Sequence, residues 1–469
     1  MRKLINLIIN ENIKVFLKIS TIIMLVVTIL LAVGYNGMYF FVSVNDRNNS
    51  YSYDDTDFQS IIDTEKKDKI EGWEARVEAY EFLIKNNVQN HSDWRAAAAF
   101  EAFNLKSAAT EQQDETEKAK LQKSFDTMLT QINNDDWKAY LKNQLDELKD
   151  NKDYPSAEKE TQLWALQYRL DNDIRPDWNT DDWKTTLFSQ VENCKRAYAE
   201  EMEKPYGERD QKQLAMYNDA ALIGLHRLDN NIEYALVPDN LINVLSDNDP
   251  FSFWSTFRNS ILLISVISVL IIIVAGSSIA TEFSNGTVKF LLINPVKRWK
   301  IFVAKYISTL TIAFLMLFIY YIFNALLGAL FFGFNNLSAP YLMLIDGDIV
   351  QISGFLFVAW KYLLGSVNLI AMATFAFAIS SLVRNSALSI GLGVFLMLSG
   401  NTAVLFLKEL LGVDWARYII FANTDLNMIL TKSTPFLGHS VSFALATLAV
   451  YMVVFLLTAW DGFVRRDVR

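Results

Sequence analysis

The stretch Ala280-Thr281-Glu282-Phe283-Ser284-Asn285-Gly286-Thr287-Val288-Lys289 lies between two long apolar runs, and the fold of the chain is decided around it. The run before it ends at Ile279, and the run after it begins at Val303. A carboxylate, a glycine and a cation follow one another in this stretch, with no pattern that would give it chemistry of its own. We interpret it as a short polar docking surface between two membrane spans, moved by a partner.

The apolar runs predict six membrane-spanning helices. Hydrophobic residues make up 52% of the chain, and several uncharged runs reach the roughly 20 residues that a helix needs to cross a bilayer. The first run is too long for a signal peptide and lacks a small-residue cleavage site, so we expect a retained anchor. The fold class is therefore an all-α polytopic membrane protein. The spans cover about Ser20–Val42, Ser260–Ile279, Val303–Phe331, Tyr362–Leu382, Ala387–Leu407 and Ser440–Ala459.

The charges are distributed very unevenly. Residues 46–258 hold about 43 acidic and 26 basic side chains, a net charge near −17, whereas the rest of the chain is basic. Lys and Arg gather at the N-terminus, in the loop 280–305, at Arg384 and in the tail 465–469. The positive-inside rule places these segments, and both termini, in the cytoplasm and residues 46–258 outside it. We expect a multi-pass protein of a cell membrane, with a composition typical of bacteria.

These observations divide the chain into three parts. Residues 1–45 are expected to form an interfacial helix and the first span, residues 46–258 a large helical extracytoplasmic domain, and residues 259–469 spans two to six with a cytoplasmic coupling helix near 282–295. The N-terminal apolar residues can share one helix face, which favours a helix in the membrane interface over a simple continuation of the first span.

Three helix starts in the extracytoplasmic segment look alike, each with Asp before Trp. They are Ser92–Arg95, Asp135–Lys138 and Asp181–Lys184. Asp at such a position accepts hydrogen bonds from the free N–H groups of the first turn, and the pattern hints at repeated helical hairpins. The Trp side chains either grip a substrate or second subunit, or anchor the core; we favour core anchors.

Inside the loop, Glu282 is close enough to the membrane that an unpaired carboxylate would be costly. Backbone N–H groups of the next turn, Lys289 or a cation on another protein are the expected partners. Gly286 permits a turn that β-branched residues resist, Thr287 can cap the helix that follows, and Pro295 ends it.

Together with Pro295–Arg298 and Lys305, the segment Glu282–Lys289 resembles the one that follows the second span in type-2 ABC transporter permeases, the membrane subunits of bacterial ABC exporters. Ser380–Ser386, which contains Arg384, looks like that family's tight turn between spans four and five. Phe463–Val468 looks like its usual end. The likeness covers about residues 1–45 and 255–469.

The resemblance implies a permease that dimerises with an identical or different second chain, each half contacting a cytoplasmic ABC ATPase subunit. ATP and Mg would bind to that partner and not to this chain. Coupling to the ATPase is carried over to Glu282, Gly286, Thr287 and Lys289 only. The cargo is expected to be hydrophobic or amphipathic, with antimicrobial peptides or drugs preferred. The large insert departs from the simplest members of the family.

Two other functions stay open. In the first, ATPase-driven movement is passed to the extracytoplasmic domain for signalling or regulation, and no cargo crosses the membrane. In the second, the chain is an adhesion or sensor protein with an oversized anchor, which six spans and a patterned inner loop disfavour.

Enzymatic activity is not expected. The chain has no Gly-x-x-x-x-Gly-Lys-Ser/Thr loop, and its three His and one Cys form no ligand pattern, so we predict no catalytic residues, bound cofactor, metal or nucleic-acid partner. Asp346-Gly347-Asp348 is interpreted as an exposed turn because the other ligands of a calcium loop are missing.

Polar residues inside the spans are candidates for a substrate path. These residues are Asn324, Asn368 and Asn401. Hydrogen bonding between helices, about 0.6 kcal/mol per contact, is the favoured alternative for each. After span five, the segment 410–420 is amphipathic and either enters the outer leaflet or forms a surface helix.

Overall fold

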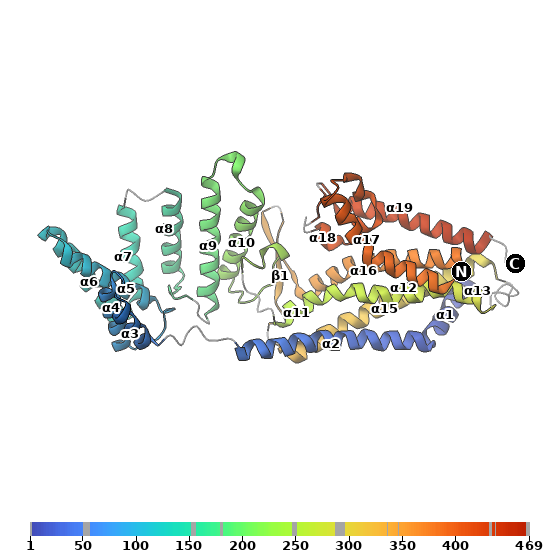
Figure 1. Cartoon of the computed structure of the whole chain (residues 1–469), viewed down its shortest axis with the longest axis horizontal. Helices are drawn as coiled ribbons and strands as arrows, with labels where there is room; N and C mark the ends of the chain where they lie inside the picture. Colours follow the sequence, from blue (N-terminus) through green and yellow to red (C-terminus); the bar gives the residue numbers. More distant parts are fainter. Residues whose placement is uncertain are drawn as a thin grey trace. The chain divides into compact units, whose positions relative to one another are not determined.

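A computed structural model describes residues 2–49, 57–151, 156–178, 182–245, 251–286, 296–334, 336–345, 347–430, 434–436 and 438–465, and these are mostly helical (Figure 1). The chain divides into two compact units. Met1–Asp46, Asn248–Ala339 and Ile352–Arg469 form the first, here called the membrane unit. Arg47–Asp247 and Pro340–Gln351 form the second, here called the acidic unit.

Six helices in the described residues are long and apolar enough to cross a membrane, which confirms the predicted number of spans. Span one is α2 (Ile19–Asn49), and α1 (Arg2–Phe16) precedes it as a separate helix that turns away from the axis of α2 (Figure 1). The remaining spans are built on α12 (Ile264–Ser278), α15 (Arg298–Phe332), α16 (Gly354–Val383), α17 (Ser386–Glu409) and α19 (Val441–Trp460).

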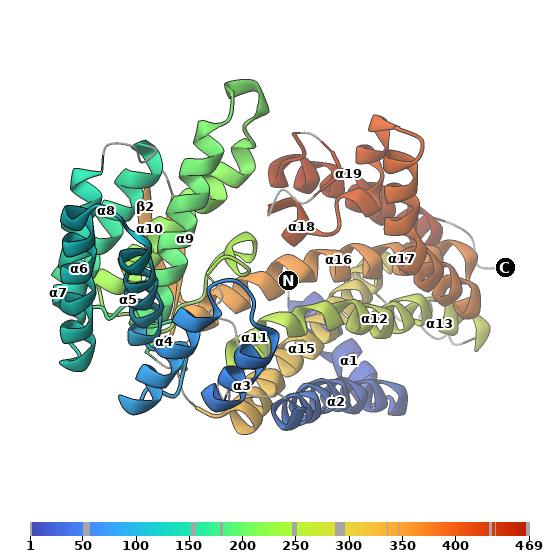
Figure 2. The same cartoon turned by 60° about the vertical axis from the view of Figure 1, so that its left-hand side comes forward.

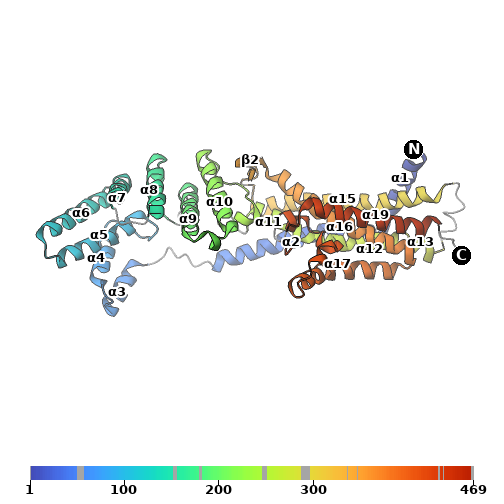
Figure 3. The same cartoon turned by 90° about the horizontal axis from the view of Figure 1, so that it is seen from above.

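Helix α16 is the centre of the membrane unit, because it packs against α12, α15, α17 and α19 (Figure 3). Two glycines allow the close approach of α12 and α17. A Cβ atom on Gly276 would lie 2.9 Å from Cγ1 of Ile390, and one on Gly393 would lie 2.7 Å from Cγ2 of Ile272. Small residues at such crossings let helix backbones approach closely, as is usual inside membranes.

Span two is interrupted near its start, where α11 (Phe253–Asn259) passes through the 3-10 turn Ser260–Leu263 into α12. Tyrosine hydroxyls satisfy the carbonyls around this interruption. Tyr35 donates to the carbonyl of Thr256 at 3.0 Å, and Tyr320 donates to the carbonyl of Ser260 at 3.1 Å. Irregular backbone at membrane depth is tolerated only where its polar groups are satisfied in this way.

After α17, the segment predicted as one amphipathic stretch forms two 3-10 turns instead, Asp414–Tyr418 and Ile420–Ala422, followed by α18 (Leu426–Leu430). Ala416 packs with Val404 and Phe436 in a small core of its own.

The acidic unit is a succession of helices in which consecutive members pack together (Figure 2). They are α3 (Phe58–Asp68), α4 (Trp73–Lys85), α5 (Trp94–Glu111), α6 (Glu115–Asn133), α7 (Trp137–Asp150), α8 (Ser156–Asp171), α9 (Trp183–Glu203) and α10 (Gln211–Asp229).

The predicted aspartate caps are present. Asp93 accepts from the N–H of Arg95 at 2.9 Å, and Asp136 accepts from that of Ala139 at 3.0 Å. Asp182 caps α9 in the same way. Trp94 and Trp137 are buried, as core anchors should be, and Trp183 is partly buried against the second core.

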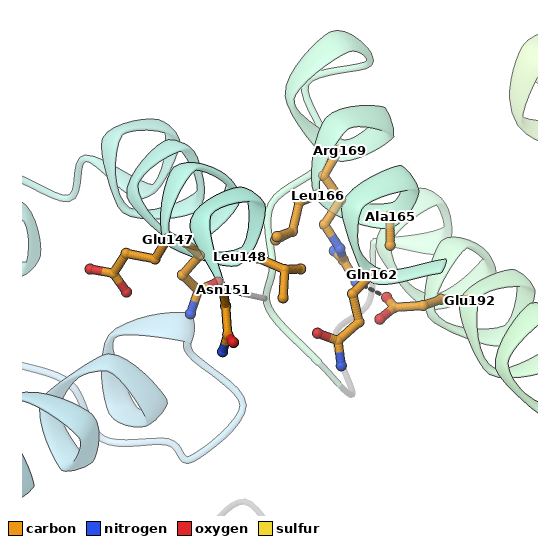
Figure 4. Close-up of a pocket in the computed structure, with 9 residues that line it drawn as sticks. Glu147, Leu148, Asn151, Gln162, Ala165, Leu166, Arg169 and Glu192 are labelled. Atoms are coloured by element: carbon orange, nitrogen blue, oxygen red, sulfur yellow. Dashed lines mark hydrogen bonds and ion pairs between the residues drawn. The ribbon is translucent and has the colours of Figure 1, made fainter. Parts of the chain in front are cut away.

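Two hydrophobic cores fill this unit, one around α3–α7 and one around α8–α10. A cleft of about 400 Å³ is lined by residues of α7, α8 and α9, and Figure 4 shows Leu148 and Asn151 on one side of it and Gln162 and Leu166 on the other. The buried guanidinium of Arg169 lies 3.4 Å from Glu192 at the edge of the cleft, and burial lowers its pKa.

One element was not expected in an all-α protein. β1 (Pro340–Ile345) and β2 (Asp348–Ser353) form a two-stranded sheet between spans three and four. Most of this hairpin belongs to the acidic unit, so that unit is not the single segment 46–258. Asp346 lies outside the described residues, and Gly347 has a φ of +94°.

The hairpin is hydrogen-bonded to the acidic unit and packs in its second core. Leu236 donates its N–H to the carbonyl of Pro340 and accepts from the N–H of Leu342, both at 2.8 Å. The side chain of Leu342 is fully buried in that core. A side chain from the connection between two spans thus completes the core of the acidic unit.

Candidate functional site

Three charged side chains from distant parts of the sequence meet in the membrane unit. Nζ of Lys305 lies 3.0 Å from Oε2 of Glu11 and 3.0 Å from Oε1 of Glu282. Lys14 adds a second cation 3.2 Å from Glu11. We call Glu11, Glu282 and Lys305 the charged junction. It joins α1, α15 and α13 (Ala280–Ser284), the short helix that follows α12.

The junction is buried. The side chains of Lys305 and Glu11 are 5% and 6% exposed, and that of Glu282 is 22% exposed. Charges withdrawn from water are tolerated only when they are paired, and removing one partner of a buried pair is strongly destabilising. Removal of any one of these three side chains would therefore leave a buried charge without its partner.

Local sequence explains how the three residues reach one another. Glu11 is the only acidic residue before Asp46, on a helix whose other charges are basic. Lys305 lies two turns inside α15, where an unpaired ammonium would be costly. Glu282 lies in α13, less than two turns beyond the end of α12 at Ser278.

A side chain of α16 stabilises the break between α12 and α13. Oγ of Ser380 accepts from the N–H of Ala280 at 2.9 Å and from that of Ile279 at 3.3 Å. This hydroxyl satisfies donors at the break between the two helices. Gly286 then follows α13 with a φ of +70°, the left-handed conformation expected of a glycine turn.

Arg384 also packs on α13. It ends α16 with a φ of +58°, and its guanidinium carbon lies 4.2 Å from the centre of the Phe283 ring. A guanidinium over a ring face is an attractive cation–π contact. Only Arg384 and Asn385 separate α16 from α17, so the turn is as tight as the sequence predicted.

Two of the four residues predicted to couple to the ATPase fall in a part of the chain that the structure does not describe. Thr287 and Lys289 lie outside the described residues, as does most of the predicted coupling helix up to residue 295. Within the part of the chain that the structure describes, no group of three His, Cys, Asp or Glu residues could hold a metal ion.

The three asparagines of the predicted substrate path are far from equivalent. Asn324 is buried and accepts at 2.9 Å from the amide of Asn36 on α2, which is the helix-to-helix hydrogen bond that the sequence favoured. Asn368 is half-buried, and Asn401 is exposed on α17.

Sequence reasoning missed the partners of Glu282. It considered Lys289, which lies outside the described residues, but not Lys305, and it did not consider Glu11 as a member of an ion pair. A lone acid on a basic helix and a lone cation inside an apolar run were the signals that could have indicated a pair. Ser380 carried no such signal.

Residues 214–469, more than half of the chain, match a protein family described as "Protein of unknown function (DUF2705)". The chain belongs to this family. The matched region includes Glu282, Lys305 and the hairpin β1–β2, but not Glu11. Two of the three members of the charged junction therefore lie in the segment that defines DUF2705.

Two proteins of Bacillus subtilis (strain 168) are similar to this DUF2705 chain. "Uncharacterized protein YhcI" is 36% identical over 228 residues, which are 48% of this chain and 72% of that protein. "Uncharacterized membrane protein YdbK" is 30% identical over 236 residues, 50% of this chain and 90% of that protein. Together with the six apolar helices, the second similarity indicates a multi-pass membrane protein. No solved structure matches the chain.

Proposed function

We propose that the chain is the membrane permease subunit of an ATP-driven ABC exporter, which moves a hydrophobic or amphipathic substrate, such as an antimicrobial peptide or drug, out of the cell. A separate cytoplasmic ATPase would bind ATP and Mg. The observation that carries the proposal is the charged junction. Because one ammonium holds both Glu11 and Glu282 at 3.0 Å, a displacement of α13 by a partner would also displace α1 and the start of α15.

The proposed orientation rests on the arginines at the ends of three spans. Arg298, Arg384 and Arg465 stand at the ends of α15, α16 and α19, and cations are favoured on the cytoplasmic side. On α1, Ile5, Ile9 and Ile13 form an exposed row four residues apart, while Glu11 is buried. Such a helix suits the inner interface, with its apolar row in the lipid. The acidic unit would then be extracytoplasmic.

A second permease chain, identical or different, completes the proposed transporter. Most of the apolar surface of α17 and α19 is not covered within one chain. Lipid and a second chain would share it.

Affinity purification of the full chain in mild detergent tests the proposal. The wild type is compared with Glu282→Ala/Gly286→Trp and with the matched control Glu409→Ala/Gly412→Trp, in which Gly412 also has a positive φ, of +66°. We expect an ATPase subunit with the wild type and the control, and its loss from the junction variant. No ATPase with any of the three would refute the permease assignment. If the Glu282→Ala/Gly286→Trp variant retained the ATPase as well as the wild type, and the two complexes hydrolysed ATP at the same rate, coupling at Glu282 would be refuted.

The hairpin favours a second candidate, an ATPase-driven signalling protein that moves its acidic unit without cargo. Residues 333–339 join span three to β1, span four begins directly after β2, and Leu342 is part of the core of the acidic unit. A movement of these spans would act on that core through the backbone.

Hydrogen exchange tests this candidate on the complex with its ATPase. Signalling predicts a nucleotide-dependent change in residues 340–351 and in α10, which Leu342→Asp abolishes and the exposed control Val350→Ala does not. Unchanged exchange in both segments during ATP hydrolysis would rule the relay out and leave transport alone.

A further inference from the structure

A cavity of about 850 Å³ lies in the membrane unit, on the side of α15 that faces α19. Its volume falls within the roughly 300–1,000 Å³ of ordinary ligand pockets. The wall is apolar, formed by Phe302 and Val303 from α15, Leu382 from α16, and Val453, Leu456 and Leu457 from α19. A hydrocarbon chain is the chemistry that such a wall accommodates.

One end of the cavity is polar. Trp460, Asp461 and Arg465 line it there, where α19 gives way to the π-turn Asp461–Arg465. Among the described residues, no acceptor takes a hydrogen bond from the indole N–H of Trp460. Trp is enriched where one side of a ring is apolar and the other meets the polar edge of a membrane.

The charge at this end is positive. Arg465 and Asp461 are both well exposed and lie 3.4 Å apart, so they offset one another only in part. Arg298 begins α15 one turn before Phe302 and shares its helix face. No carboxylate of the described residues lies within ion-pair distance of Arg298. The turn that carries Arg465 packs against α15, which brings the two helix ends together.

We propose that this cavity binds an anionic membrane lipid, with an acyl chain between α15 and α19 and its phosphate group at Arg298 and Arg465. Basic pockets between membrane helices are known to favour anionic head groups. A zwitterionic lipid would bring an extra cation to the same place and gain less from the two arginines.

The site is next to the charged junction. The ring of Phe302 lies 6.2 Å from that of Phe463, and Phe463 lies 6.4 Å from Phe283 on α13. A bound lipid therefore supports the packing behind the segment that we assign to coupling. The inference goes beyond the proposed function, since lipid binding does not require an ATPase.

Quenching of tryptophan fluorescence by brominated lipids tests the site. The full chain is reconstituted in bilayers with increasing fractions of dibrominated phosphatidylglycerol or dibrominated phosphatidylcholine. The signal of Trp460 is the difference between wild type and Trp460→Phe. Trp360→Phe is the matched control, because Trp360 is 53% exposed on α16 and lines no cavity that we describe.

We expect the Trp460 signal to saturate at a low fraction of phosphatidylglycerol and to require a several-fold higher fraction of phosphatidylcholine. The Trp360 signal should follow the lipid fraction alike for both lipids. The variant Arg298→Gln/Arg465→Gln should abolish the preference while Trp460 is still quenched.

Two results would overturn the proposal. Quenching of Trp460 that rises in proportion to the lipid fraction, equally for both lipids, would mean ordinary contact with the bilayer. Saturation without a preference for phosphatidylglycerol would mean that the cavity takes acyl chains regardless of head group. Neither result depends on whether an ATPase is found.

Discussion

Lys305 is paired with Glu11, a residue 294 positions earlier in the chain, at 3.0 Å and away from solvent. The same ammonium also holds Glu282 at 3.0 Å. One lysine thus fixes the N-terminal helix and the segment after span two to the start of span three.

Replacing Lys305 by Met should destabilise the membrane unit by about 3–5 kcal/mol, because two carboxylates would stay buried without their cation. Thermal denaturation of the purified chain in detergent measures the loss. Lys14→Gln is the control, since Lys14 is 59% exposed and should change stability by well under 1 kcal/mol. Recovery is expected in Glu11→Gln/Glu282→Gln/Lys305→Met. A Lys305→Met protein as stable as the wild type would show that the junction contributes no stability.

Gly393→Ala should cost about 1–3 kcal/mol, because the new Cβ would lie 2.7 Å from Ile272 and force α12 and α17 apart. Gly391→Ala on the same helix meets nothing within 4 Å and should be neutral or slightly stabilising. Melting temperatures of the two variants in the same detergent decide the matter. Equal effects would mean that the close approach of these helices is unimportant.

Leu342→Ala should destabilise the acidic unit by about 2–5 kcal/mol, the usual range for a buried Leu. Val350→Ala on the second strand should cost little, since Val350 is 37% exposed. Hydrogen exchange of α10 reports the local stability. If α10 exchanges no faster in Leu342→Ala, the hairpin is not part of that core.

Glu101 should make the stability of the acidic unit pH-dependent. Burial raises the pKa of this carboxyl, which accepts a hydrogen bond from Tyr140 at 3.0 Å. A folded pKa above the unfolded one means that the stabilising contribution is present at low pH and is lost as pH rises through the folded pKa. Glu101→Gln should therefore slow exchange of α5 relative to wild type at pH 7.5 but not near pH 4. The exposed Glu111→Gln, on the same helix, should show no such difference. A gain at both pH values would contradict this assignment.

Much of both units could be predicted because the signals are local. A run of apolar residues indicates a span wherever it occurs, and Asp before Trp indicates a capped helix, as at Asp93 and Asp136. The tight turn at Arg384 was equally readable from the sequence.

The charged junction and the hairpin could not be predicted in this way. Nothing near Glu282 indicates that its partner stands 23 positions later or that the second carboxylate stands before span one. The pairing of Leu236 with Pro340 and Leu342 is likewise made by backbone N–H and carbonyl groups. Almost every residue carries these groups, so the residue types do not indicate the pairing.

The packing of the β1–β2 hairpin in the core of the acidic unit has an evolutionary consequence. Because Leu342 completes a core whose other buried members lie between Ala165 and Leu245, the acidic unit is encoded in two separate pieces. A recombination event that transferred residues 47–247 alone would give the recipient a domain whose core lacks Leu342, and would leave the hairpin in the donor without the core in which it packs. Exchange of this domain between proteins therefore has to carry the connection between spans three and four as well.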